Sequence, residues 1–99
     1  MKVERDDNGR VTVFADERID TNAAPRFAAE MEQAVKDARE LVLDFSRLTY
    51  IASSGLRPVM LAIKAMNRQG TMRITGVNDD VYDILETIGF VGLCDVERE

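Results

Sequence analysis

Residues 41–67 read LVLDFSRLTYIASSGLRPVMLAIKAMN, and this segment decides the fold of the chain. It begins with a short apolar run, passes through a polar connector and ends in an apolar repeat at helical spacing. The succession predicts a central strand over 41–45 and an amphipathic helix that follows the Ser-Ser-Gly turn at 53–55. A helix needs at most one serine as a cap, so the second serine calls for an explanation.

The first fifteen residues are predicted to form a hairpin. Asn8-Gly9 is a strong signal for a two-residue turn, because both residues tolerate positive φ. The register of such a turn pairs Val3 with Phe14. The first strand is polar and is expected at the sheet edge, whereas the second has more β-forming residues and is expected inside the sheet.

Further helices and strands are predicted from apolar repeats and end signals. Thr21 or Asn22 is expected to cap the first helix and Asn78 the third, which ends at Gly89. The first helix, the strand after the second helix, the third helix and the last strand are expected at residues 23–38, 71–77, 79–88 and 91–96. The stripe of the third helix that should face the core consists of Val81, Ile84, Leu85 and Ile88.

The resulting order of elements is β-β-α-β-α-β-α-β. Strands that alternate with helices predict an α/β fold with a mostly parallel sheet, to which the hairpin adds one antiparallel pair. A length of 99 residues fits a single domain that spans residues 1–99.

Composition excludes several classes of function. The chain has no histidine, so it has no histidine-based metal site or catalytic triad, and we expect no cofactor and no enzymatic activity. A net charge of −5 argues against nucleic-acid binding. Cys94 is the only cysteine, no apolar run is long enough for membrane insertion, and no signal-like start is present. A cytoplasmic location is therefore expected.

Charge is unevenly distributed along the chain. Residues 45–78 contain no acidic residue and carry a charge of +5, which leaves −10 for the remainder. The predicted outer face of the second helix contributes most of this basic segment. Its members are Arg57, Leu61, Lys64 and Arg68. Such a face is either solvated or a docking surface for a partner.

The serine pair allows three interpretations. Ser54 is the better candidate for the helix cap, in which case Pro58 makes the first turn irregular or delays the regular helix by a residue or two. The turn could also bind phosphate, but it lacks the P-loop pattern that nucleotide hydrolysis needs. The third interpretation is that one serine is phosphorylated, because the positive end of a helix tolerates the added charge of about −1.5 to −2.

Asp44 ends the central strand and suggests the phospho-acceptor of a response-regulator receiver. That site also needs an acidic pair after the first strand and a lysine near the last strand, and the chain has neither. Asp44 is therefore expected to support its own loop.

The pattern LVLDFS-x6-SSGL over 41–56 resembles the signature of STAS domains, and specifically that of bacterial anti-sigma-factor antagonists. Ile19-Asp20-Thr21 and the segment 84–90 are similar to two further parts of the family pattern, so the resemblance covers essentially the whole chain. It implies a mixed four- to five-stranded sheet with the helices packed mainly on one side.

The resemblance also implies partner switching. The unphosphorylated antagonist would bind an anti-sigma factor with a histidine-kinase-like ATPase domain and serine kinase activity, phosphorylation would release it, and a serine phosphatase would reset it. The implied acceptor is Ser53, with Ser54 as the runner-up. The residues expected around the acceptor are Asp20, Asp44, Ser54 and Gly55, and those expected to bind the partner are Arg57, Leu61, Lys64 and Arg68.

One residue departs from the family pattern. The family often has Asp directly before the acceptor serine, and this chain has Ala52. The departure favours an alternative function, that of a constitutive STAS subunit in a larger complex such as a transporter assembly, without phosphorylation switching.

Overall fold

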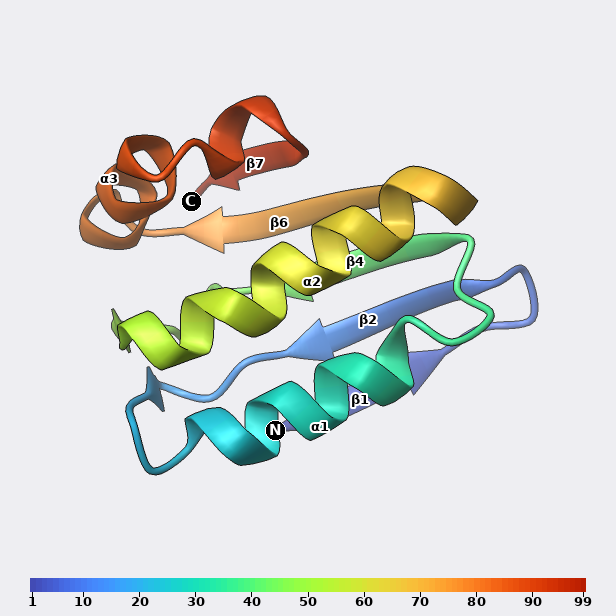
Figure 1. Ribbon diagram of the computed structural model, residues 1–99, viewed down its shortest axis with the longest axis horizontal. Coiled ribbons are helices and arrows are strands. Elements are labelled where there is room, and N and C mark those ends of the chain that lie inside the picture. The colour runs from blue at the N-terminus through green and yellow to red at the C-terminus, as the bar shows by residue number, and fades with distance from the viewer.

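Five strands form one mixed sheet in the order β1-β2-β4-β6-β7 (Figure 1). The computed structural model describes all residues, 1–99. The edge strand β1 pairs antiparallel with β2, and β2, β4, β6 and β7 run parallel. These strands comprise Lys2–Arg5, Arg10–Phe14, Glu40–Asp44, Thr71–Val77 and Asp95–Arg98. The expected α/β fold with a mixed sheet is confirmed.

The helices lie on one side of this sheet, as the resemblance implied (Figure 1). α1 (Ala24–Ala34) and α2 (Ser53–Gln69) run side by side across the sheet, and α3 (Asp79–Thr87) lies beyond the end of β6. None of these helices combines the length and the apolar character that crossing a bilayer requires.

The sheet therefore has one covered face and one open face. Side chains alternate along β4, so that Leu41 is fully buried on the covered face while Glu40 points to the open one. On the open face Glu40 pairs with Arg10 at 2.8 Å and with Arg73 at 3.4 Å, and Arg73 also pairs with Glu97 at 3.2 Å. These ion pairs suit a sheet face that is exposed to water. Arg73 therefore belongs to the open face of the sheet and not to the basic outer face of α2.

The hairpin register differs by one residue from the prediction, because Val3 lies opposite Val13 and not opposite Phe14. The loop is longer than two residues because the Asp6 carboxylate accepts hydrogen bonds from the backbone N–H groups two and four residues ahead, at 2.8 and 3.0 Å. These hydrogen bonds hold the pKa of Asp6 below its usual value. The observed register puts Val3 on the covered face, beside Val13.

The first helix ends at Ala34, four residues earlier than predicted. The chain then turns through Asp37, which has a φ of 61°, and Ala38 returns to the core. The side-chain amide of Gln69, at the end of α2, donates hydrogen bonds to the carbonyl groups of Val35 and Ala38 at 2.6 and 2.8 Å. Gln69 thus provides hydrogen-bond donors to carbonyl groups, 34 and 31 residues earlier in the chain, that have no helical donor.

The ends of α3 are where the sequence predicted them. The Asn78 side chain accepts a hydrogen bond from the N–H of Val81 at 2.8 Å, and Gly89 has a φ of 87° just after the helix. The short 3-10 helix η1 (Phe90–Gly92) follows, so the last strand begins at Asp95, later than predicted.

The predicted core-facing stripe of α3 is wrong in two positions. Val81 and Leu85 are buried, but Ile84 is 37% exposed and Ile88 is 41% exposed. Because α3 lies at the end of the sheet and not across it, only a narrow stripe of the helix is covered.

Candidate functional site

Ser53 and Ser54 are the first two residues of α2, and both side chains are exposed. Neither hydroxyl group makes a hydrogen bond within the chain, and the residue at the N-cap position is Ala52, which cannot act as a side-chain cap. The prediction that Ser54 caps the helix is therefore wrong. The first turn of α2 also has no acidic residue, so the helix itself supplies no counter-charge to the positive end of its dipole.

A small parallel pair of strands sets the start of α2. β3 (Arg18–Ile19) pairs with β5 (Tyr50–Ile51), and the N–H of Ala52 donates a hydrogen bond to the Ile19 carbonyl at 2.8 Å. The carboxyl ends of parallel strands lie together, so this pair brings the loop at Asp20 next to the start of α2. No sequence pattern predicts β3, in which Ile19 is the single β-branched residue.

Gly55 is required by the packing of the first helical turn. A Cβ atom at this position would lie 2.8 Å from Cγ2 of Ile19 and 3.0 Å from Cγ1 of Ile51. The Gly55 N–H donates to the Ala52 carbonyl at 2.9 Å, so it is not free for a ligand. The first turn of α2 thus rests directly on the β3–β5 pair.

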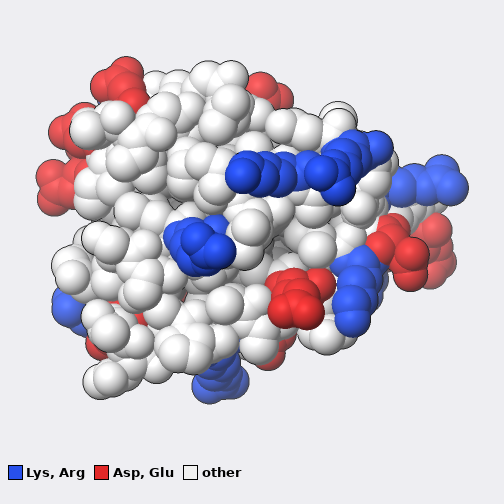
Figure 2. All heavy atoms as spheres, in the orientation of Figure 1, with Lys and Arg blue, Asp and Glu red and all other residues white.

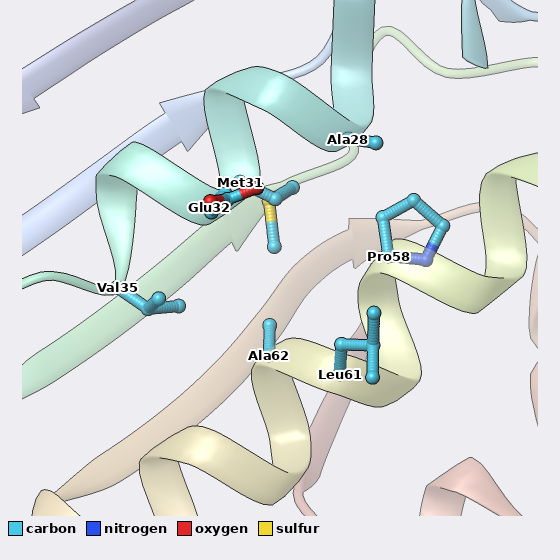
Figure 3. A pocket seen from close by; sticks show the side chains of 7 residues that line it. All are labelled: Ala28, Met31, Glu32, Val35, Pro58, Leu61 and Ala62. Carbon is cyan, nitrogen blue, oxygen red and sulfur yellow. The ribbon is translucent and has the colours of Figure 1, made fainter. Parts of the chain in front are cut away.

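Pro58 does not delay the helix, which begins at Ser53, but the first turn is tight, because the Gly55 N–H donates to the carbonyl group three residues back. The missing N–H leaves the Ser54 carbonyl without its usual helical donor. Pro58 is buried and faces α1 (Figure 3). The helix continues through Pro58, and the expected irregularity is confined to the first turn.

Asp20 organises the start of α1. Its Oδ1 atom accepts a hydrogen bond from the N–H of Ala23 at 2.9 Å, and its carbonyl group accepts from Ala23 and Ala24 at 3.1 and 2.9 Å. Neither Thr21 nor Asn22 caps the helix, so that prediction is wrong. The hydrogen bond from Ala52 to the neighbouring Ile19 carbonyl holds this loop against the start of α2.

Asp44 supports its own loop, as expected. Its Oδ1 atom accepts hydrogen bonds from the backbone N–H and the Oγ of Ser46, at 2.9 and 2.6 Å. Alternation along β4 places Asp44 on the open face of the sheet, and no hydrogen bond joins it to either serine of α2. The structure therefore does not bring Asp44 into contact with the serine pair.

The outer side of α2 carries a basic surface, which we call the α2 face. Its members Ser53, Arg57, Leu61, Lys64 and Arg68 are spaced three or four residues apart, so they share one side of the helix. All are exposed, Leu61 to 52%, and none of the three basic residues forms an ion pair within the chain. Figure 2 shows the basic atoms following the line of α2.

An apolar groove borders the α2 face on the side of α1. Side chains of the two helices face each other across a hollow of about 240 Å³ (Figure 3). Its lining consists of Ala28, Met31, Glu32, Val35, Pro58, Leu61 and Ala62. An adjoining hollow reaches Ser54 and Arg57 at the start of α2. Sequence reasoning missed this groove, because it exists only where two separate helices meet.

Cys94 offers no reactive thiol. It is half-buried, and this burial, together with the negative charge of Asp95, raises the pKa of the thiol to about 11. The thiol is therefore protonated and weakly nucleophilic at neutral pH.

Comparison with known proteins settles the family. A profile of the STAS domain matches residues 1–98. The chain belongs to the STAS domain family. The protein BtrV of Bordetella bronchiseptica, named as an anti-sigma factor antagonist, is 34% identical to this STAS domain over 77 residues, which cover 76% of the chain and 66% of BtrV. The remaining third of BtrV lies outside the match.

Solved structures share the fold of this STAS domain. An anti-sigma factor antagonist from Mycobacterium paratuberculosis has a TM-score of 0.87 and 19% identity, covering 99% of this chain and 84% of that one. The Bacillus protein SpoIIAA in its phosphorylated form has a TM-score of 0.76 and 16% identity, with coverages of 99% and 91%. A sulfate transporter family protein from Wolinella succinogenes has a TM-score of 0.74 and 18% identity, with coverages of 90% and 76%.

Proposed function

We propose that this STAS domain is an anti-sigma factor antagonist that binds its partner through the α2 face and is switched by phosphorylation of Ser53. The partner is an anti-sigma factor with a histidine-kinase-like ATPase domain that acts as the serine kinase, and a serine phosphatase reverses the modification in the cytoplasm. One observation carries the proposal: an exposed hydroxyl group without a hydrogen bond begins a helix that has neither a side-chain cap nor an acidic first turn.

This position accepts a phosphate without unfolding. The positive end of the α2 dipole favours the negative charge, and the free N–H groups at a helix start favour its oxygen atoms. Arg57 lies one turn further along the same face and offers a charge-assisted partner. The phosphate therefore changes the surface and leaves the core intact.

Ser53 is preferred over Ser54 because of where each side chain lies. Both serines are exposed, and Ser54 lines the hollow beside α1 together with Arg57 and Leu61, whereas Ser53 does not line it. A kinase reaches an outer-face hydroxyl more readily than one at the wall of a groove. Ser53 lies four residues before Arg57, so a phosphate on it also falls within the α2 face.

The α2 face has the make-up of a small interface. Leu61 supplies an exposed apolar residue at the rim of the apolar groove, and Arg57 and Lys64 surround it with positive charge. Three basic residues give this face a charge of +3, and a phosphate of about −1.5 to −2 on Ser53 cancels about half to two thirds of it. An acidic partner would lose attraction at the moment of phosphorylation.

The decisive experiment combines phosphosite mapping with binding. The chain is incubated with its cognate kinase and ATP, modified residues are mapped by mass spectrometry, and the affinity of Ser53→Asp and Ser53→Ala for the kinase is measured by calorimetry. We expect phosphate on Ser53, at least tenfold weaker binding of Ser53→Asp and near-normal binding of Ser53→Ala. Ser54→Asp is the matched control. Absence of phosphate on Ser53 together with absence of kinase binding contradicts the proposal.

The contribution of the basic residues has a separate test. Reversal of Arg57 and Lys64 to Glu is expected to slow association with an acidic partner and to reduce its dependence on salt. The control is the reversal of Lys36 and Arg47, which are exposed and lie outside the α2 face. Equal association rates for both double variants would mean that the α2 face is an ordinary solvent-exposed surface and does not bind the partner.

A second function has its own supporting observation. Ala52 stands where antagonists often have Asp, and a sulfate transporter family protein has the same fold. A constitutive subunit of a larger assembly needs the α2 face but no switch. Equal affinity of wild type, Ser53→Ala and Ser53→Asp for a partner isolated from the native cell would favour this function.

A further inference from the structure

The outer side of α3 carries a second exposed apolar surface, which we call the α3 face. Ile84 and Ile88 are 37% and 41% exposed, and with Asp83 and Thr87 they line a shallow hollow. Asp80 lies one turn before Ile84 and is also exposed. Neither Asp80 nor Asp83 takes part in an ion pair within the chain.

The α3 face complements the α2 face in charge. On α2, Leu61 has Arg57 four residues before it and Lys64 three residues after it. On α3, Ile84 has Asp80 four residues before it, and Asp83 directly precedes it. Each face thus presents an exposed aliphatic side chain beside unpaired charges, positive on one helix and negative on the other.

The two faces cannot satisfy each other within one molecule. Figure 2 shows acidic atoms at the edge of the molecule where α3 lies and basic atoms along α2, with uncharged surface between them. The partner that presents the complementary face is therefore a second copy of the chain. We propose that copies of this STAS domain associate head to tail, with the α2 face of one copy packed on the α3 face of the next.

Such a contact is heterologous, so each added copy leaves one α2 face and one α3 face free. Assembly then continues beyond a dimer or closes into a ring. Two helix faces form an interface below the roughly 1,200 Å² typical of stable complexes, and a net charge of −5 on each copy adds repulsion, so the association is weak. It would occupy the α2 face and compete with an anti-sigma factor, but it does not depend on that function.

The first test uses the wild-type chain alone. Analytical ultracentrifugation over a concentration series up to the order of 1 mM, a range suited to weak complexes, should give an average mass that rises above the 11.1 kDa of the monomer and past that of a dimer. Added salt should shift the rise to higher concentration. A mass that stays at the monomer value, or that levels off at a dimer insensitive to salt, overturns the inference.

The second test exchanges the charges. The variant Arg57→Glu, Lys64→Glu has two acidic faces, and the variant Asp80→Lys, Asp83→Lys has two basic faces, so each should be monomeric. An equimolar mixture restores both kinds of complementary contact and should recover the mass increase of the wild type. The control Lys36→Glu, Arg47→Glu has the same net charge as the first variant and should still associate. If both variants are folded by circular dichroism and their mixture stays monomeric, the head-to-tail contact is wrong.

Discussion

The starts of α2 and α3 differ although both helices follow directly after strands on the same side of the sheet. α3 begins with a side-chain cap from Asn78 and with Asp79 and Asp80 in its first turn. α2 begins after Ala52 with no cap and no acidic residue, and Ser53 occupies the position that Asp79 occupies in α3.

The start of α3 is stabilised by its own side chains, whereas the start of α2 lacks a side-chain cap and an acidic residue. The Asn78 amide group also donates a hydrogen bond to the Leu48 carbonyl at 3.0 Å, so α3 is tied to the connector ahead of α2. At α2 the backbone packing is equally specific, since Gly55 fits against β3 and β5, but the polar side chains are unused. A free hydroxyl in a well-ordered turn is the combination that a modification site needs.

The largest effect is expected at the capped start. Asn78→Ala removes the cap and the hydrogen bond to the Leu48 carbonyl, so the free energy of unfolding should fall by about 2 kcal/mol and Tm by roughly 10 °C. Thermal unfolding followed by circular dichroism measures the change. Asn78→Ser keeps a cap and should lose about half as much, and equal losses for the two variants would contradict the assigned role of the cap.

Adding the missing cap to α2 should have the opposite sign. Ala52 has extended backbone angles, as a cap residue requires, so Ala52→Asp should raise the free energy of unfolding by about 1 kcal/mol. Urea unfolding gives this value. Ala52→Asn supplies the cap without the charge and should gain slightly less. If neither variant is more stable than the wild type, the missing side-chain cap does not limit the stability of the α2 start.

A smaller pair of effects tests the first helical position. A negative charge at position 53, as phosphoserine or Ser53→Asp, should stabilise the domain by about 0.5 kcal/mol, and Asp79→Ser should destabilise it by a similar amount. Both shifts should shrink in high salt. Thermal unfolding at low and high ionic strength checks the pair. Destabilisation by the charge at position 53 would mean that phosphorylation acts on the fold and not on the surface.

The smallest effect is expected for removal of the serine hydroxyl groups. Ser53→Ala and Ser54→Ala each delete an exposed group without a hydrogen bond, so stability should change by less than about 0.5 kcal/mol. Urea unfolding of both variants decides the point. A loss near 1 kcal/mol in either variant would show that the serine acts as a structural cap in solution.

Much of the candidate site was predictable because its signals are local. The Ser-Ser-Gly turn, the basic spacing of Arg57, Lys64 and Arg68 and the exposed Leu61 follow from helical periodicity alone. The serine that would cap α2 was predicted wrongly, because the helix start depends on a hydrogen bond from Ala52 to the distant Ile19. The neighbourhood of Asp20 and Ser53 likewise depends on the β3–β5 pair, whose short strands carry too few residues for a recognisable pattern.

By itself the sequence determined the order of the three α-helices and of the five strands of the main sheet, the central strand, the cap and end of α3 and the membership of a mixed α/β class. These features depend on residues within a few positions of one another, where periodicity and end signals act directly. Only the tertiary structure decided the hairpin register, the early end of α1, the groove between α1 and α2 and the exposure of Ile84 and Ile88. Each of these depends on which distant segments pack together. The spacing of side chains along one segment does not predict which other segment will pack against it.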